Sequence, residues 1–284
     1  YPGKVLLDDK SKKYVQRFLD ATKSDMLFAQ RVIFVEGLAE QILLSILARY
    51  MDKSLEDNHI AVINVGGRFF DHFLSLFDNP KPYTILKKIV CLTDRDPVRK
   101  SKCDDNFLKC YPFQHNQDTA RYEYKDNATD KIQQYMTHSN IRFFSQDEVK
   151  GKTFEYDLVQ HNPTLELLIT ESMINQSEIK NLMNSFKNNK SVEDLLKILP
   201  EGTEDNPNKK NTELKRGILE SNWNDNDKKT AIIASRYLNS VAKGVNALEL
   251  AYVLENNLSK KGQSGFQDFI VPTYIKNAID WVCQ

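Results

Sequence analysis

The segment Arg31-Val-Ile-Phe-Val-Glu36-Gly37-Leu-Ala-Glu40 decides the fold class. Its apolar, β-branched run predicts a buried strand, and a helical pattern over Leu38–Tyr50 follows at once. A second apolar run, Lys88–Leu92, leads to Asp94-Arg95-Asp96. Acids at the ends of such strands are expected at the carboxyl edge of a parallel sheet, where open α/β folds bind ligands.

Strand and helix patterns alternate through the first half of the chain. This alternation predicts βαβ units and a mainly parallel sheet flanked by helices. The expected strands are Arg31–Val35, Ile60–Val65, Lys88–Leu92 and Asn140–Phe144, and the expected helices between them are Leu38–Tyr50, Phe69–Phe77 and Lys131–Met136.

Four consecutive segments are predicted from this pattern. They are a helical lead-in over residues 1–30, a core over 31–164, an inserted polar helical region over 165–235, and C-terminal helices over 236–284. Within the last two segments we expect a helix capped by Ser191, an exposed loop over Glu201–Asn211, a helical block over Lys229–Leu258, and a last helix opening at Pro272.

Composition sets broad limits. The 284 residues carry 39 Lys and Arg against 39 Asp and Glu, so there is no global basic signature, although an acidic site and a basic track can cancel in the sum. No apolar run approaches the ~18 residues of a membrane span. The four cysteines form no CxxC pair, which favours reduced thiols in a cytoplasmic protein. Cys103, Cys110 and His115 could also form a zinc site, but their spacing matches no usual zinc-ligand pattern.

Four carboxylates at one sheet edge predict a cation site. Glu36, Glu40, Asp94 and Asp96 would repel one another unless divalent cations lie between them, and hard oxygen ligands suit Mg²⁺ or Mn²⁺. In an extended chain, Asp94 and Asp96 would point the same way. Alternatively, Glu40 only compensates the helix dipole, and the two aspartates are solvated turn acids before Pro97.

The turn Gly66-Gly67-Arg68 follows the second expected strand. Two glycines allow close backbone approach to a phosphate, and Arg68 adds positive charge, so the three residues are candidates for binding DNA phosphate. The alternative is an ordinary tight turn. The dinucleotide fingerprint GxGxxG is absent here.

Together these motifs resemble a Toprim domain, the metal-binding domain of topoisomerases, bacterial primases and certain nucleases. More narrowly, the chain resembles the OLD (overcoming lysogenization defect) family of ATPase-coupled nucleases. The segments that carry the resemblance are residues 26–40, Ile63-Asn-Val-Gly-Gly-Arg-Phe-Phe70, Lys152-Thr-Phe-Glu155-Tyr-Asp-Leu158, Ala242-Lys243-Gly-Val-Asn-Ala-Leu-Glu-Leu-Ala251 and residues 271–279.

The resemblance implies a Rossmann-like α/β fold and a two-metal site for hydrolysing phosphodiester bonds in DNA. Lys243 would approach the scissile phosphate, and Thr153 would assist through its hydroxyl. Two ions of Mg²⁺ or Mn²⁺ would be held by Glu36, Glu40, Asp94, Asp96 and Glu155.

Family members of this kind carry an upstream ABC-type ATPase. The chain contains no GxxxxGK[ST] motif and starts with Tyr1 in place of Met, so we expect it to bind no ATP and to be the C-terminal part of a longer protein. The resemblance also suggests a homodimer.

Three functions compete at this point. The first is a metal-dependent DNA endonuclease or nickase, which accounts for all six charged positions. The second is another Toprim enzyme, such as a primase or topoisomerase, although no tyrosine has a recognisable nucleophile context. The third is a non-catalytic module for assembly or partner binding.

Overall fold

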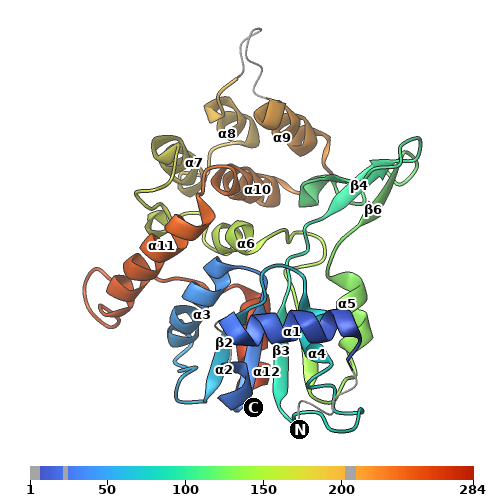
Figure 1. The fold of residues 1–284 in the computed structure, drawn as a ribbon. Coiled ribbons are helices and arrows are strands. Elements are labelled where there is room, and N and C mark those ends of the chain that lie inside the picture. The colour runs from blue at the N-terminus through green and yellow to red at the C-terminus, as the bar shows by residue number, and fades with distance from the viewer. Residues whose placement is uncertain (1–6, 22–24, 202–208) are drawn as a thin grey trace. The chain divides into compact units, whose positions relative to one another are not determined.

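The structure is a computed structural model that describes residues 7–21, 25–201 and 209–284. Its chain divides into two compact units (Figure 1). We call Tyr1–Asp94, Ala128–Ser145 and Thr273–Gln284 the sheet unit, and Arg95–Asn127 with Gln146–Pro272 the helical unit. Both units are discontinuous in sequence, whereas the four segments expected from the sequence are consecutive and remain a prediction.

The sheet unit is built on four parallel strands in the order β2-β1-β3-β7. The central strand β1 pairs with a strand on each side, and its Ile33 lies opposite Val62 and Val90. The predicted α/β class with a parallel sheet is therefore confirmed. The strands are β1 (Arg31–Val35), β2 (Ile60–Asn64), β3 (Lys88–Leu92) and β7 (Ile141–Phe144).

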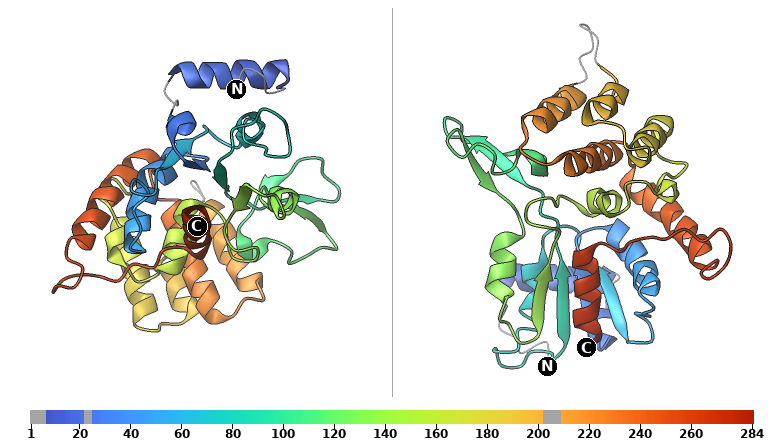
Figure 2. Two further views of the ribbon diagram at one scale, coloured as in Figure 1. Left: turned by 90° about the horizontal axis from the view of Figure 1, so that it is seen from below. Right: turned by 180° about the vertical axis from the view of Figure 1, so that it is seen from behind.

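Helices cover both faces of this sheet because its strands are apolar on both sides. Val32 and Phe34 belong to an apolar cluster with α1 and α4, while the alternate residues Ile33 and Val35 point to the face where α3 and α12 lie (Figure 2). Each large apolar side chain buried in this way contributes about 1.5–3 kcal/mol. The helices are α1 (Asp9–Ala21), α2 (Asp25–Phe28), α3 (Leu38–Tyr50), α4 (Phe70–Leu74), α5 (Thr129–Tyr135) and α12 (Thr273–Cys283).

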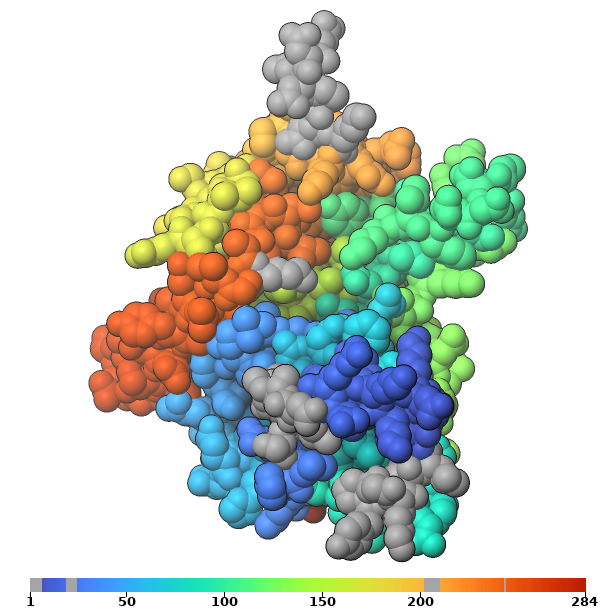
Figure 3. All heavy atoms as spheres, in the orientation of Figure 1, coloured from blue at the N-terminus to red at the C-terminus, as the bar shows by residue number. Residues whose placement is uncertain are grey.

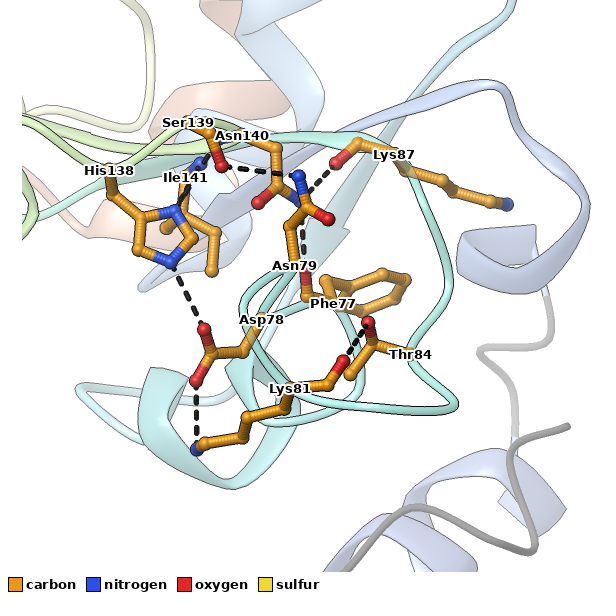
Figure 4. Close-up of polar contacts among 10 residues, drawn as sticks. All are labelled: Phe77, Asp78, Asn79, Lys81, Thr84, Lys87, His138, Ser139, Asn140 and Ile141. Carbon is orange, nitrogen blue, oxygen red and sulfur yellow. Dashed lines mark hydrogen bonds and ion pairs between the residues drawn. The ribbon is translucent and has the colours of Figure 1, made fainter.

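Side-chain hydrogen bonds tie the start of β7 to the loop after α4 (Figure 4). The Asn140 amide donates to the main-chain carbonyls of Phe77 and Lys87, each at 2.7 Å. These bonds satisfy carbonyls that the loop itself leaves unpaired, and they fix the edge of the sheet where β7 begins.

Asp78 completes this connection. Its carboxylate lies 2.8 Å from the Lys81 Nζ and 3.1 Å from the His138 Nε2 (Figure 4). Partial burial raises the pKa of Asp78, but the hydrogen bonds to Lys81 and His138 outweigh burial, so the pKa lies below its usual value.

The helical unit also contains a small antiparallel sheet, in the order β5-β4-β6, that the sequence did not predict. Its strands are two to four residues long and carry polar side chains, so they lack the apolar run that marks a core strand. They are β4 (Val98–Ser101), β5 (Leu108–Lys109) and β6 (Tyr122–Lys125).

The remaining helices surround α10, which packs against α6, α7, α8 and α9. As predicted, the Ser191 hydroxyl caps α8 by accepting a hydrogen bond from the Asp194 N–H at 3.2 Å. The helices are α6 (Phe154–His161), α7 (Gln176–Lys187), α8 (Val192–Ile198), α9 (Lys209–Glu220), α10 (Asp225–Leu238) and α11 (Lys243–Leu258), with short 3-10 turns η2 (Pro112–Gln114) and η3 (Glu166–Leu168).

Two predictions in this region are wrong in detail. The expected loop over Glu201–Asn211 ends early, because α9 begins at Lys209 and the buried Asn211 amide donates to the Pro200 carbonyl at 2.9 Å; residues 202–208 lie outside the described residues. The expected block Lys229–Leu258 is two helices, interrupted between Leu238 and Lys243. No helix in the described ranges is long and apolar enough to cross a membrane.

Candidate active site

The ends of β1 and β3 meet at one edge of the sheet unit. The Glu36 carboxylate accepts hydrogen bonds from the Thr93 hydroxyl and from the Asp94 N–H, the latter at 3.1 Å. The structure therefore brings Glu36 beside Asp94, as the two strand ends predicted. Thr93, which holds the Glu36 carboxylate in place, had no signal in the sequence.

The Gly66-Gly67 turn lies at the same edge. Both glycines have positive φ, 75° and 113°, which an L side chain adopts only with strain. The Gly67 N–H donates to the Glu36 carbonyl at 2.8 Å, and the Gly66 N–H donates to the Asn64 side chain at 2.7 Å. Since both amides are engaged within the protein, the predicted phosphate binding at this turn would depend on the exposed Arg68 side chain, and it remains a prediction.

Gly37 lies between Glu36 and the start of α3. Its φ of −136° and ψ of 172° are extended values that any residue adopts, so no glycine-specific tight turn exists here. A Cβ at Gly37 would instead lie 2.9 Å from the Glu40 Oε2. Glu40 lies in the first turn of α3 with 8% of its surface exposed, and its carboxylate folds back over Gly37. That position suits both a metal ligand and dipole compensation.

Asp96 belongs to the helical unit, and its backbone is not extended. Its φ is +42°, and its N–H donates to the Lys152 carbonyl at 2.9 Å. The expectation that Asp94 and Asp96 point the same way as alternate residues of a strand is therefore wrong, because β3 has already ended at Leu92. The Asp96 carboxylate lies 3.5 Å from the Lys109 Nζ.

Arg95, between the two aspartates, anchors the start of the helical unit. Its guanidinium donates to the Gln146 carbonyl at 2.7 Å and forms an ion pair with Asp126 at 3.0 Å. Its N–H also donates to the Gln146 side chain at 2.9 Å. Both side chains of the ion pair are less than a tenth exposed. Such a buried, multiply bonded arginine fixes the backbone on which Asp96 depends.

Glu155 lies in the first turn of α6 and is 5% exposed. The preceding Thr153 caps that helix, because its hydroxyl accepts a hydrogen bond from the Tyr156 N–H at 3.4 Å. The Thr153 hydroxyl, which the resemblance predicted to assist in catalysis, thus has a structural use as a helix cap. Burial, together with nearby Asp147, raises the pKa of Asp157 well above its usual value, and Arg95 opposes this shift.

Lys243 is the first residue of α11, but its side chain lies outside the described residues. The structure therefore leaves the predicted contact of Lys243 with a scissile phosphate as a prediction. Ala242 precedes it as the N-cap residue, and no side-chain cap is present there.

A cavity of about 340 Å³ in the helical unit contains Asp96 and Thr153. Three lysines line it with them, and the buried Lys152 donates through its Nζ to the Cys110 carbonyl at 2.6 Å. No sequence pattern groups these lysines, because they come from three separate segments. The lining also includes Lys109, Lys210, Cys110, Tyr111, Glu213, Leu238 and Asn239.

The donor atoms at the sheet edge suit a hard divalent cation, because Glu36, Glu40 and Asp94 offer only carboxylate oxygens. Among the described residues, however, no three His, Cys, Asp or Glu side chains are gathered closely enough to hold a metal ion. The residues thus fit a metal in chemical type and in their place at the sheet edge, without forming a complete ligand set.

The sheet unit thus has a four-stranded parallel sheet with Glu36 directly after β1 and Asp94 two residues after β3. Residues 27–96 match the family described as "Overcoming lysogenization defect protein-like, TOPRIM domain". The chain therefore contains a Toprim domain of the OLD type, and the resemblance recognised in the sequence is confirmed.

Two solved structures that are similar to this chain come from different organisms. The C-terminal region of the Burkholderia pseudomallei OLD protein is 17% identical, with 90% of this chain and 97% of that chain covered and a TM-score of 0.45. The C-terminal region of the Xanthomonas campestris pv. campestris OLD protein is 16% identical, with 84% and 98% covered and a TM-score of 0.36. No curated protein matches the chain.

Proposed function

We propose that this chain is a divalent-metal-dependent DNA endonuclease that nicks DNA by hydrolysing a phosphodiester bond. The observation that carries the proposal is the pairing of Glu36 with the Asp94 backbone at adjacent strand ends of an OLD-type Toprim domain. The residue types support the proposal further, since three carboxylates on the sheet unit offer oxygen ligands at the edge where such folds bind ligands.

The proposed ligands for two Mg²⁺ or Mn²⁺ ions are the five acids that the family resemblance indicates. When bound, such ions supply charge neutralisation and an activated water. The Thr93 hydroxyl and the Asp94 N–H would hold the Glu36 carboxylate in one orientation, which limits the reorganisation that binding requires. The ligands would be Glu36, Glu40, Asp94, Asp96 and Glu155.

Positive side chains would position the DNA. Arg68 is exposed beside the turn after β2, where it would contact a backbone phosphate. Lys243 would stabilise charge that develops on the scissile phosphate. The Lys109 amine lies 3.5 Å from the Asp96 carboxylate. If a bound cation neutralised Asp96, the amine would be free to contact a DNA phosphate instead.

The wider assembly is part of the same proposal. An upstream ABC-type ATPase in a longer protein would control when the nuclease acts, and a homodimer would present two copies of the site to DNA. A non-catalytic module for assembly or partner binding is the competing function.

Plasmid nicking tests the proposal. Wild-type protein with Mn²⁺ or Mg²⁺ is expected to convert supercoiled plasmid to the open-circular form, and EDTA is expected to stop this. Glu36→Gln removes the charge of a proposed ligand and should slow nicking by about tenfold to a hundredfold or more. Even residues that only orient metal ligands cause a loss of about that size when they are mutated. Glu56→Gln, an exposed turn residue of the same unit, is the matched control. A folded wild type that binds Mn²⁺ but never nicks would favour the assembly module.

A further inference from the structure

A second cavity, of about 310 Å³, lies within the helical unit and shares no lining residue with the lysine-lined one. It is formed by β4, β6, η2 and α9, and in Figure 3 both the strands (green) and α9 (light orange) reach the surface. Its lining includes three arginines and two tyrosines: Arg99, Arg121, Arg216, Tyr122 and Tyr124. No part of the proposed nuclease site uses these residues.

Strand register explains why the arginine and the tyrosines face the same way. Arg99 of β4 lies directly opposite Tyr124 of β6, and Tyr122 is two residues along the same strand. In a β-sheet, directly opposed residues and alternate residues of one strand share a face. The Arg99 guanidinium accordingly lies 4.8 Å from the centre of the Tyr122 ring.

The arginines of this cavity are weakly paired. Arg99 lies 3.7 Å from Glu213, and Arg121 lies 3.9 Å from Asp118, both beyond hydrogen-bond distance. Asp118 uses its carboxylate locally, accepting from the Arg121 N–H at 3.0 Å. Glu220 also lines the cavity, so its three guanidinium groups outnumber the two lining carboxylates.

Arg216 of α9 is the least engaged of the three. Within the described parts of the chain, its side chain makes no hydrogen bond, ion pair or ring contact, and it is exposed. An unpaired guanidinium in a cavity with a second arginine and an aromatic ring is suited to a phosphate, which accepts two parallel hydrogen bonds from one guanidinium.

We propose that this cavity binds a nucleotide, with its phosphate between Arg99 and Arg216 and its base against Tyr122. The volume suits a small ligand, and aromatic rings bind bases of any sequence by stacking. The nucleotide is either free or one unit of a DNA strand; the DNA source rests on the proposed nuclease function, because a nuclease must hold its substrate beyond the cleaved bond.

Crosslinking locates the ligand directly. A short oligodeoxythymidine that carries fluorescein and a photoreactive thymidine is irradiated with wild-type protein in EDTA, where no cleavage occurs. The expected product is a crosslinked peptide that contains Tyr122 or Tyr124. Crosslinks confined to other peptides would overturn the proposal.

Fluorescence anisotropy with the same probe measures the contribution of each arginine. Arg216→Ala should weaken binding about tenfold, and Arg99→Ala/Arg216→Ala should weaken it further, as expected for charge-assisted hydrogen bonds. Arg17→Ala, on the exposed side of α1 in the sheet unit, is the matched control and should change nothing. Arg216→Lys keeps the charge and separates a charge effect from the bidentate geometry. Equal affinity of wild type and the double variant would overturn the proposal.

Competition separates the two sources of the nucleotide. Displacement of the probe by dTMP shows that a free nucleotide occupies the cavity, whereas displacement by unlabelled oligonucleotide alone identifies a DNA strand; either result supports the site. The nuclease proposal is judged by a separate result. If the wild type nicks plasmid with Mn²⁺ but no crosslink forms on β6, the nucleotide site is wrong and the nuclease proposal stands.

Discussion

Replacing Arg95 with Leu should destabilise the protein strongly, because it leaves a buried carboxylate without its partner. Arg95 and Asp126 lie 3.0 Å apart with side chains only 9% and 8% exposed. Removing one partner of such a pair costs about 3–5 kcal/mol, since the remaining charge stays desolvated. Arg95→Leu also removes the 2.7 Å hydrogen bond to the Gln146 carbonyl, so we expect the upper half of that range.

Urea unfolding followed by circular dichroism measures this loss. Adding Asp126→Asn to Arg95→Leu should recover part of the stability, because the uncompensated charge is gone. Lys131→Leu is the control, since its ion pair with Asp71 has side chains 30% and 61% exposed and should contribute at most about 1 kcal/mol. If Arg95→Leu costs no more than Lys131→Leu, the anchoring role given to Arg95 is wrong.

Three further predictions concern other parts of the chain. Burial raises the pKa of Cys110 to about 11, so a thiol reagent near neutral pH should label exposed Cys103 and spare Cys110 until the protein unfolds. The folded state keeps the Cys110 proton that the unfolded state loses, so the contribution of Cys110 to stability falls as pH rises from 9.0 to about 11. The pKa of Asp78 is lowered in the folded state, so its contribution to stability is present above its ordinary value of 3.8 and is lost at lower pH; the loss of stability in Asp78→Asn, measured by urea unfolding, should shrink as the pH falls below 3.8. Gly67→Ala, at φ +113°, should cost about 1–3 kcal/mol in thermal unfolding, and Gly37→Ala, with an extended backbone, should cost less.

The sequence predicted the centre of the sheet well because β1 and β3 are buried on both faces. Arg31–Val35 and Lys88–Leu92 are continuous apolar runs, and the structure places β1 and β3 at those bounds. The strands β4, β5 and β6 were missed because short polar strands on a surface carry no such run. The turn at Gly66-Gly67 was predicted, and its positive φ values favour glycine; Gly37 has an extended backbone that any residue adopts.

The candidate site was predictable only in its residue types. Acids after two strands indicated one edge, and Glu36 does lie beside Asp94 there. The residues that hold those acids could not be inferred, because their contacts join distant positions: Thr93 reaches Glu36, and Arg95 reaches Asp126. No local pattern encodes such pairings, which depend on the register of the folded chain.

Nicking of supercoiled plasmid by Asp94→Ala at saturating Mn²⁺ tests the proposed metal-dependent nuclease most directly. Asp94 follows β3 and lies beside the Glu36 carboxylate, and no proposed ligand can replace it. Asp57→Ala, an exposed aspartate of the same unit, is the matched control. We predict that Asp94→Ala loses nicking while it keeps its fold and that Asp57→Ala keeps the wild-type rate. Nicking by folded Asp94→Ala at the wild-type rate would contradict the account.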